Sequence, residues 1–257
     1  MSATRIFDQH HYDLLNRARG DVVSQILGQL KPTLNLETAI DVGCGLGHFS
    51  GLLSSLGFHV TGVDGRSENV HESARRFPAT QFFKINVEDA QITQLGTFDL
   101  VFCFGLLYHL ENPLLAIRNL RGITKSLLLV EGLVYPGNDP IMGLVDETEY
   151  EDQGLRNFAF YPTEACLVKM LYRAGYANVY RFLMLPAHPE YQDAYGRPRN
   201  RTVLAASLKP LPTDLLSLIE EPSSASKPWL KTSSGDSSFV SRLRRIVNAV
   251  YRKKPTQ

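Results

Sequence analysis

Glycine occupies every second position from Gly43 to Gly47, directly after the apolar stretch Ala39-Ile40-Asp41-Val42. Glycine adopts backbone conformations that are closed to other residues and lets a ligand approach the main chain closely. We expect a helix from Leu46 to Leu56, whose unpaired N–H groups point at the same turn. Such a turn either binds a ligand or serves only to pack a strand tightly against a helix.

The spacing around this turn indicates the kind of ligand. A dinucleotide-binding turn reads G-x-G-x-x-G, whereas this one reads D-x-G-x-G-x-G, with Asp41 two residues before the first glycine. A carboxylate there would repel a pyrophosphate but suits a ligand that carries an ammonium group. A second strand-like run, 58–65, contains Asp64 near its end, where a carboxylate can accept hydrogen bonds from both hydroxyls of a ribose. A solvent-exposed turn is the alternative for Asp64, but the two acids together favour a nucleoside site.

Length and charge narrow the class of protein. The 257 residues, 44% of them apolar, suffice for one α/β core with material left for a lid or a tail. Residues 1–209 carry 19 Lys and Arg against 22 Asp and Glu, whereas residues 210–257 carry 8 against 4. Enzymes that act on nucleic acids usually have a basic folded domain, so this balance favours a small-molecule substrate, with nucleic acid as the weaker alternative.

The cysteines and the first residues indicate the compartment. Cys44, Cys103 and Cys166 are widely spaced and match neither a disulfide framework nor a zinc motif. No segment has a signal-peptide layout, and no apolar run approaches the ~20 residues of a membrane helix, so we expect a cytoplasmic protein. The adjacent His10 and His11 have no H-x3-H partner, and we expect no metal site.

Strand-like and helix-like segments alternate along residues 39–209, after an amphipathic helical cap over 1–38 whose helix ends before Pro32. This order predicts parallel βαβ units with right-handed crossovers. We therefore expect a Rossmann-like, doubly wound α/β fold with a mostly parallel seven-stranded sheet and an antiparallel last strand. The remaining expected elements are strands at 81–87, 96–105, 126–131, 179–185 and 202–208, and helices at 67–77, capped by Ser67, at 114–120 and at 161–175.

Two regions depart from this alternation. Residues 132–161 are expected to be a lid insertion that shapes the acceptor pocket. Residues 210–257 are expected to contain a flexible linker over 223–238 and a basic amphipathic helix over 239–254. That helix either makes a peripheral contact with anionic lipid or a partner protein, or docks on its own domain. The lid carries an acidic cluster that is either a solvated face or an attraction for a cationic substrate: Asp146, Glu147, Glu149, Glu151 and Asp152.

The acid-led glycine turn, Asp64 and the strand that begins at Phe98 resemble the class I S-adenosylmethionine (SAM) dependent methyltransferases over roughly residues 36–209. The resemblance implies SAM as the cofactor. It also implies an adenine clamp after the third strand and an N-terminal preface that folds over the cofactor, which makes Tyr12 and Arg19 pocket candidates. The candidate cofactor-binding residues are Asp41, Gly43, Cys44, Gly45, Asp64, Gly65, Asn86, Val87, Glu88, Phe104 and Gly105.

Within that superfamily, two segments are similar to the bacterial enzymes that carboxymethylate the wobble uridine of tRNA with carboxy-SAM. They are Gly105-Leu106-Leu107-Tyr108-His109-Leu110 with Asn112-Pro113, and Asn157-Phe158-x-Phe160-x-Pro162-Thr163. In that group a tyrosine and an arginine hold the extra carboxylate, and Tyr108 and Arg201 match their positions. The group also carries an additional N-terminal domain, for which this sequence is too short. Carboxy-SAM and tRNA are therefore the alternatives to SAM and a small molecule.

Methyl transfer from a sulfonium is an in-line displacement that needs a base only when the acceptor is protonated at neutral pH. We expect His109 to be that base, because it follows the fourth strand and a histidine pKa lies near neutrality. Tyr108 is the second candidate catalytic residue, and His188 and Tyr161 are weaker candidates for the base. Packing beneath the cofactor is the alternative role for His109.

Three functions fit these observations. The leading hypothesis is biosynthetic methyl transfer to an oxygen, nitrogen or carbon atom of a small molecule. The alternatives are a tRNA-modifying methyl- or carboxymethyltransferase, and a non-catalytic SAM-binding scaffold recruited through the basic tail.

Overall fold

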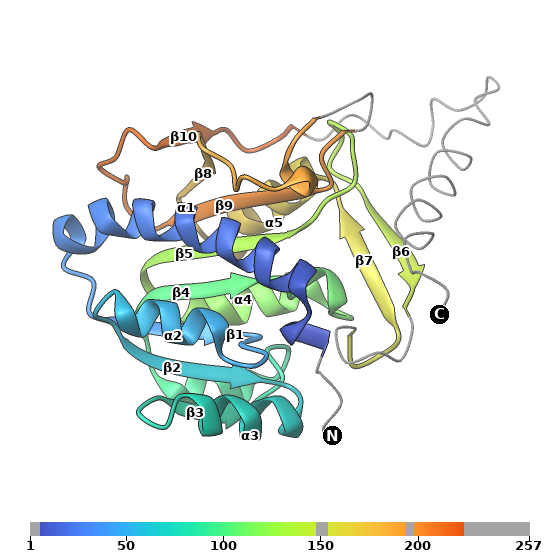
Figure 1. Cartoon of the computed structure of the whole chain (residues 1–257). Helices are drawn as coiled ribbons and strands as arrows, with labels where there is room; N and C mark the ends of the chain where they lie inside the picture. The colour runs from blue at the N-terminus through green and yellow to red at the C-terminus, as the bar shows by residue number, and fades with distance from the viewer. Residues whose placement is uncertain (1–5, 148–153, 194–197, 224–257) are drawn as a thin grey trace. The chain divides into compact units, whose positions relative to one another are not determined.

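Residues 6–147, 154–193 and 198–223 are described by the computed structural model of this chain. They alternate between strands and helices in one unit that ends at Pro222 (Figure 1). The strands are β1 (Thr38–Val42), β2 (His59–Asp64), β3 (Gln81–Lys84), β4 (Phe98–Phe104), β5 (Thr124–Leu133), β6 (Met142–Asp146), β7 (Phe158–Pro162), β8 (Asn178–Phe182), β9 (Arg201–Ser207) and β10 (Leu216–Ile219). The helices are α1 (His10–Leu34), α2 (His48–Ser55), α3 (Ser67–Arg76), α4 (Pro113–Ile123) and α5 (Glu164–Ala174), with short 3-10 turns η1 (Ile6–Asp8), η2 (Ala90–Leu95), η3 (Leu107–His109) and η4 (Pro189–Tyr191).

The main sheet has eight strands in the order β10-β8-β9-β5-β4-β1-β2-β3. Strands β1 to β5 pair in parallel, whereas β9 is antiparallel to both β5 and β8. The Rossmann-like, mostly parallel fold is therefore confirmed, but the expected number of seven strands is wrong. The extra strand, β10, pairs with β8 and forms one edge of the sheet. It is short and only Leu216 is buried along it, so its sequence has too weak an alternation to indicate a strand.

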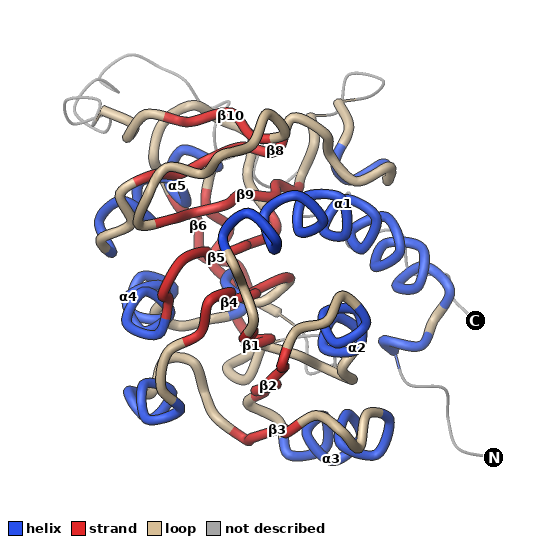
Figure 2. The backbone as a smooth tube through the Cα atoms, turned by 90° about the vertical axis from the view of Figure 1, so that its left-hand side faces the viewer, coloured by secondary structure: helices blue, strands red, loops and turns tan. Residues whose placement is uncertain are grey.

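The helices cover both faces of the sheet: Figure 2 shows α1, α2 and α3 on one side and α4 and α5 on the other. Side chains of a strand alternate between the two faces of the sheet, so each central strand contributes side chains to two hydrophobic cores. Phe102 of β4 packs with Phe49 of α2 in one core, and Val101 and Cys103 pack in the core beneath α4 and α5. The parallel strands thus end together at one edge of the sheet, where the turns that follow them meet.

Helix α1 extends past Pro32 to Leu34, so the expected end before Pro32 is wrong. Proline removes one backbone hydrogen bond, which is a small loss in the last turn of a helix. The Thr33 hydroxyl also donates to the Gln29 carbonyl at 2.8 Å. Asn35, the residue that caps the C-terminal end of the helix, has a left-handed conformation with φ of 51°.

Several other boundaries differ from the expected ones for local reasons. Helix α2 begins at His48, because Gly47 is its cap residue with φ of 84°. Arg66 is the cap residue of α3, so Ser67 is the first helical residue and not a cap. Thr163 does cap α5, with its side chain accepting a hydrogen bond from the Cys166 N–H at 3.1 Å. Strand β3 is shorter than expected, whereas α4 and β5 are longer.

The expected lid insertion, residues 132–161, contains a small antiparallel sheet made of β6 and β7. Its register pairs Leu144 with Phe160, and β7 lies against η3, the turn that follows β4. Residues 148–153, with three of the five clustered acids, lie outside the described residues, as does almost all of the expected C-terminal linker and helix. Among the described helices, none is long and apolar enough to cross a membrane.

Candidate active site

The glycine turn after β1 has the backbone conformation that its sequence predicts. Gly43 and Gly47 have φ values of 75° and 84°, in the left-handed region that favours glycine. A Cβ atom on Gly43 would lie 2.9 Å from Leu106 Cδ2, so the turn packs directly against the segment after β4. The N–H groups of Gly43 and Cys44 both donate to the Val63 carbonyl, at 2.9 and 3.0 Å. These bonds hold the turn against the end of β2.

Asp64, the last residue of β2, holds the same turn through its side chain. Its Oδ2 atom accepts a hydrogen bond from the Gly45 N–H at 2.9 Å. Its Oδ1 atom accepts from the Arg66 N–H at 2.8 Å and from Asn69 Nδ2 at 3.2 Å. Burial raises the pKa of Asp64, and these hydrogen bonds oppose the rise. A carboxylate has about four acceptor sites, so one remains for a ligand hydroxyl.

Asp41, an expected cofactor-binding residue, is buried and is not among the residues that line the cavity. Its Oδ2 atom accepts a hydrogen bond from Ser50 Oγ of α2 at 2.6 Å. Burial raises the pKa of Asp41 to about 7, against the effect of the Ser50 hydrogen bonds. Side chains alternate along a strand, and the next residue, Val42, lines the cavity instead. Asp41 therefore acts on the turn indirectly, by fixing α2 to the end of β1.

The segment after β3 is held by its own polar contacts. Asn86 Oδ1 accepts a hydrogen bond from the Glu88 N–H at 3.1 Å. The Val87 carbonyl accepts from Asn119 Nδ2 at 2.8 Å, and Glu88 Oε1 accepts from the Asn112 N–H at 2.6 Å. These hydrogen bonds connect the turn after β3 with the segment that follows β4.

One cavity of about 560 Å³ extends over these turns, within the roughly 300–1,000 Å³ typical of ligand pockets. The candidate residues on its wall are Gly43, Cys44, Gly45, Asp64, Gly65, Asn86, Val87, Glu88, Phe104, Gly105, Tyr108 and His109. Tyr12, Arg19 and Arg201 line it as well. Tyr161 and His188 are described residues that do not line it, so the structure does not bring these two candidate bases to the cavity.

A buried cluster of charged groups adjoins the cavity. Arg19 of α1 and Arg201 of β9 both pair with the Glu131 carboxylate of β5, at 2.9 and 3.0 Å. Tyr191 donates its hydroxyl to Glu131 and accepts a hydrogen bond from Arg19 Nε at 3.0 Å. Burial opposes ionisation of Glu131, but the charges of Arg19 and Arg201 outweigh it and hold its pKa below the usual value. The Arg201 guanidinium also lies 5.8 Å from the centre of the Tyr108 ring.

Sequence analysis missed Glu131 as a site residue. The signal was present, because this carboxylate follows four consecutive apolar residues of a central strand. A fully buried acid in such a position needs a basic partner.

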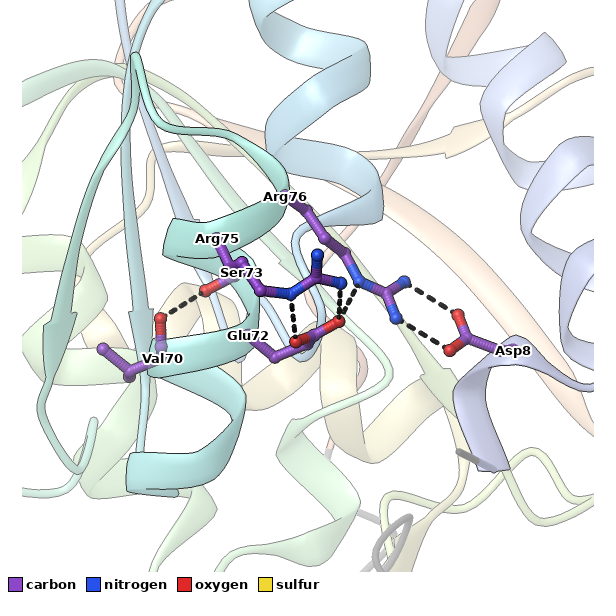
Figure 3. Close-up of polar contacts among 6 residues, drawn as sticks. All are labelled: Asp8, Val70, Glu72, Ser73, Arg75 and Arg76. Carbon is purple, nitrogen blue, oxygen red and sulfur yellow. Dashed lines mark hydrogen bonds and ion pairs between the residues drawn. The ribbon is translucent and has the colours of Figure 1, made fainter. Parts of the chain in front are cut away.

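The start of the chain contributes a second group of residues that sequence analysis missed. Figure 3 shows Asp8 of η1 facing Arg76 of α3. Both guanidinium NH2 nitrogens donate to the Asp8 carboxylate at 2.7 Å, and Arg76 Nε donates to Glu72 Oε1 at 2.7 Å. Asp8 and Arg76 both line the cavity, and no motif distinguishes them from ordinary surface charges.

His109 contacts the small sheet of the insertion. Its Nδ1 atom lies 2.6 Å from Glu147 Oε1, and the Glu147 side chain is only 1% exposed. Glu147 Oε2 also accepts a hydrogen bond from the Gly154 N–H at 2.8 Å. The solvated-face interpretation of the acidic cluster is therefore wrong for Glu147. The Gly154 carbonyl accepts a hydrogen bond from Arg66 NH2 at 3.3 Å, and both residues line the cavity.

The fold is similar to that of solved methyltransferases. The N-terminal domain of EvdMO1, solved with SAH bound, superimposes with a TM-score of 0.62 at 18% identity, over 78% of this chain and 85% of that one. Magnesium protoporphyrin IX methyltransferase from Synechocystis PCC 6803, solved with SAM, gives a TM-score of 0.52 at 20% identity, over 79% and 93%. At these identities the likeness shows the fold alone.

Sequence comparison adds a family match and curated relatives. Residues 40–127 match the family model described as "Methyltransferase domain". The tRNA U34 carboxymethyltransferase of Actinobacillus succinogenes is 30% identical over 164 residues, 60% of this chain and 49% of the relative. That of Shewanella sediminis is 31% identical over 183 residues, 67% and 54%. The chain thus spans about half the length of the curated relatives it matches.

The sheet order is that of a Rossmann-like methyltransferase fold, and residues 40–127, which include the glycine turn, match the methyltransferase domain family. The chain is also similar to the tRNA U34 carboxymethyltransferases over part of their length.

Proposed function

We propose that this chain binds SAM in the cavity and transfers its methyl group to a small-molecule acceptor. The observation that carries the proposal is the position of Asp64, which lines the cavity while its carboxylate holds the glycine turn through the Gly45 N–H. A buried carboxylate with remaining acceptor capacity suits a ribose, and a turn without side chains suits close approach of the rest of the nucleoside.

The other wall residues fit this assignment. Asn86, Val87 and Glu88 supply polar and apolar atoms for an adenine ring at the neighbouring strand end. When bound, SAM supplies an electrophilic methyl group on a sulfonium. The chain's own work is then to align the acceptor and to exclude water, and Asp8 and Gly154 contribute to the cavity wall.

A small-molecule acceptor is supported by the charge of the folded part. Residues 1–209 carry a slight excess of acids, whereas binding of tRNA requires many contacts from Lys and Arg to phosphates. His109 lies on the cavity wall and is the proposed base for an acceptor that arrives protonated. Tyr108, beside it, is the proposed second contact to the acceptor.

A second candidate function is carboxymethyl transfer to tRNA from carboxy-SAM. It is favoured by the pairing of Tyr108 with Arg201, which both line the cavity with the guanidinium 5.8 Å from the ring centre. The similarity to tRNA U34 carboxymethyltransferases supports it as well. In this case the two side chains would hold the extra carboxylate of the donor.

Mass spectrometry of the small molecule that co-purifies with the protein, followed by calorimetric titration with SAM and with carboxy-SAM, tests the proposal. Preference for SAM, with tRNA binding that is weak at 50 mM salt, is the expected result. Preference for carboxy-SAM, with tRNA affinity that falls steeply as salt rises, would establish the second candidate. Binding of neither donor would contradict both.

A further inference from the structure

We infer that Glu147, the residue directly after β6, is a positioning residue that fixes His109 as the base for a hydroxyl-bearing acceptor. The inference rests on the proposed methyl transfer and adds both a residue and a substrate class to it. It is carried by the contact between the insertion and the turn after β4.

The Glu147 carboxylate is held at both oxygens. Oε1 lies 2.6 Å from His109 Nδ1, and Oε2 accepts the Gly154 N–H at 2.8 Å. The backbone around it is fixed too, because the Glu147 N–H donates to the Asn157 carbonyl at 2.8 Å. With 1% of its side chain exposed, Glu147 has little freedom to turn away from the imidazole. Such a carboxylate can set the orientation of a histidine ring.

The contact also determines which ring nitrogen carries the proton. The Glu147 carboxylate lies within ion-pair distance of Nδ1, although Nδ1 has no well-aligned hydrogen bond. A carboxylate oxygen at 2.6 Å would repel a lone pair on Nδ1, so the contact favours a proton on that nitrogen and leaves the lone pair of the neutral imidazole on Nε2. Within the described ranges, no residue forms a hydrogen bond with His109 Nε2. The His109 side chain is 13% exposed, and the residue lines the cavity. The free nitrogen is thus the one available to a bound acceptor.

This arrangement suits an acceptor that must lose a proton. A neutral hydroxyl is a weak nucleophile until its proton is removed, whereas a neutral aromatic amine attacks first and can lose its proton to water afterwards. As the acceptor oxygen bonds to the methyl carbon, the electrons of the carbon–sulfur bond return to sulfur, and the hydroxyl proton passes to Nε2. Glu147 then balances the positive charge of the imidazolium, as a carboxylate does for a catalytic histidine in other enzymes.

Glu147 also has a structural contact, since it holds Gly154 beside the cavity. A purely structural role would change folding or cofactor affinity when the carboxylate is altered, but it would leave the tautomer of His109 unaffected. The test must therefore report on the ring itself.

The first measurement is an NMR spectrum of the full chain with 15N-labelled histidine, with His109→Asn used to assign the signals. We expect the Nδ1–H tautomer in the unaltered protein and in Glu147→Asp, and its loss in Glu147→Ala, which has no acceptor. Asp146→Asn, which changes the exposed acid next in sequence, should leave the spectrum unchanged. A wild-type Nε2–H tautomer, or an unchanged Nδ1–H tautomer in Glu147→Ala, would overturn the inference. This measurement needs neither donor nor acceptor.

The second measurement is methyl transfer from SAM to a catechol and to a matched aromatic amine. We expect transfer to the catechol, and Glu147→Gln should lower its kcat by about 10–100-fold while the KM for SAM changes less than twofold. An unchanged kcat in Glu147→Gln, or transfer to the amine alone, would overturn the inference but leave the proposed methyl transfer standing. Failure of the unaltered protein to bind SAM in calorimetry would overturn the proposed function, and the role of Glu147 with it.

Discussion

Asp8 and Arg76 form a two-bond ion pair in which both guanidinium NH2 groups reach the carboxylate at 2.7 Å (Figure 3). The two residues come from η1 and α3, and both line the cavity. The pair therefore fastens the start of the described chain beside the site. The Arg76 side chain is 29% exposed and that of Asp8 37%. A partly exposed ion pair is weak enough to break and re-form.

Replacing Asp8 with Asn should speed release of the ligand from the cavity. A partly exposed ion pair contributes about 0.2–1 kcal/mol, so we expect S-adenosylhomocysteine to dissociate up to about fivefold faster in stopped-flow measurements. Arg75→Gln is the control, because Arg75 pairs only with Glu72 among the described residues. An equal acceleration in both variants would show that the Asp8 contact has no specific role.

Replacing Asp64 with Ala should weaken SAM binding by well over tenfold. Each hydrogen bond from a ribose hydroxyl to a carboxylate contributes about 1.5–3 kcal/mol, and the variant also loses the bond to the Gly45 N–H. Asp99→Ala is a matched control, since Asp99 Oδ2 accepts backbone N–H groups of Glu37 and Thr38 at the opposite end of the sheet. Calorimetry that gives the same affinity for Asp64→Ala and the unaltered protein would place the ribose elsewhere.

Asp41 should make the unliganded protein less stable as pH rises. Its pKa is raised by burial to about 7 in the folded chain, from an ordinary value near 4. The folded state therefore binds the proton more tightly, and the stability it contributes is lost between about pH 4 and pH 7. Asp41→Asn keeps an acceptor for Ser50 without this titration. In urea unfolding, the free energy of unfolding of the variant should rise relative to that of the unaltered protein across that range, by at most roughly 1.4 kcal/mol per pH unit. A constant difference between pH 4 and pH 7 would refute this assignment.

Glu131→Gln should destabilise the fold strongly. The change leaves the guanidinium groups of Arg19 and Arg201, which are 6% and 9% exposed, without their shared counter-charge. Removing one partner of a buried ion pair costs about 3–5 kcal/mol. Glu190→Gln, which removes the more exposed partner of Arg201, should cost far less in the same urea unfolding experiment. A similar loss of unfolding free energy in the two variants would mean that the burial of Glu131 does not make its ion pairs more important to stability than that of Glu190.

Much of the fold could be predicted because its signals are local. Apolar runs interrupted by glycine and polar turns identified β1, β2 and β4, and the glycines fixed the conformation after β1. Strand β10 could not be found in this way, because an edge strand with one buried side chain differs little from a loop. The end of α1 could not be placed because a proline in the last turn of a helix costs only one backbone hydrogen bond.

The site was predictable where residues follow strand ends, and not where it depends on contacts between distant segments. Asp64 and Val87 reach the cavity because parallel strands end at one edge. The direction of the Asp41 side chain could not be predicted, because the pleat of the strand sets it and turns this one toward Ser50. The pairings of Glu131 with Arg19 and of Glu147 with His109 join segments that are far apart in the sequence. The spacing of residues within a motif does not predict such contacts.

The most direct measurement is a crystal structure of the full chain grown with S-adenosylhomocysteine. We expect a ribose hydroxyl on the Asp64 carboxylate, the adenine ring beside Val87 and the sulfur near the glycine turn at Gly43. A nucleoside bound outside this cavity, or a crystal at millimolar ligand with the cavity free of it, would contradict the account.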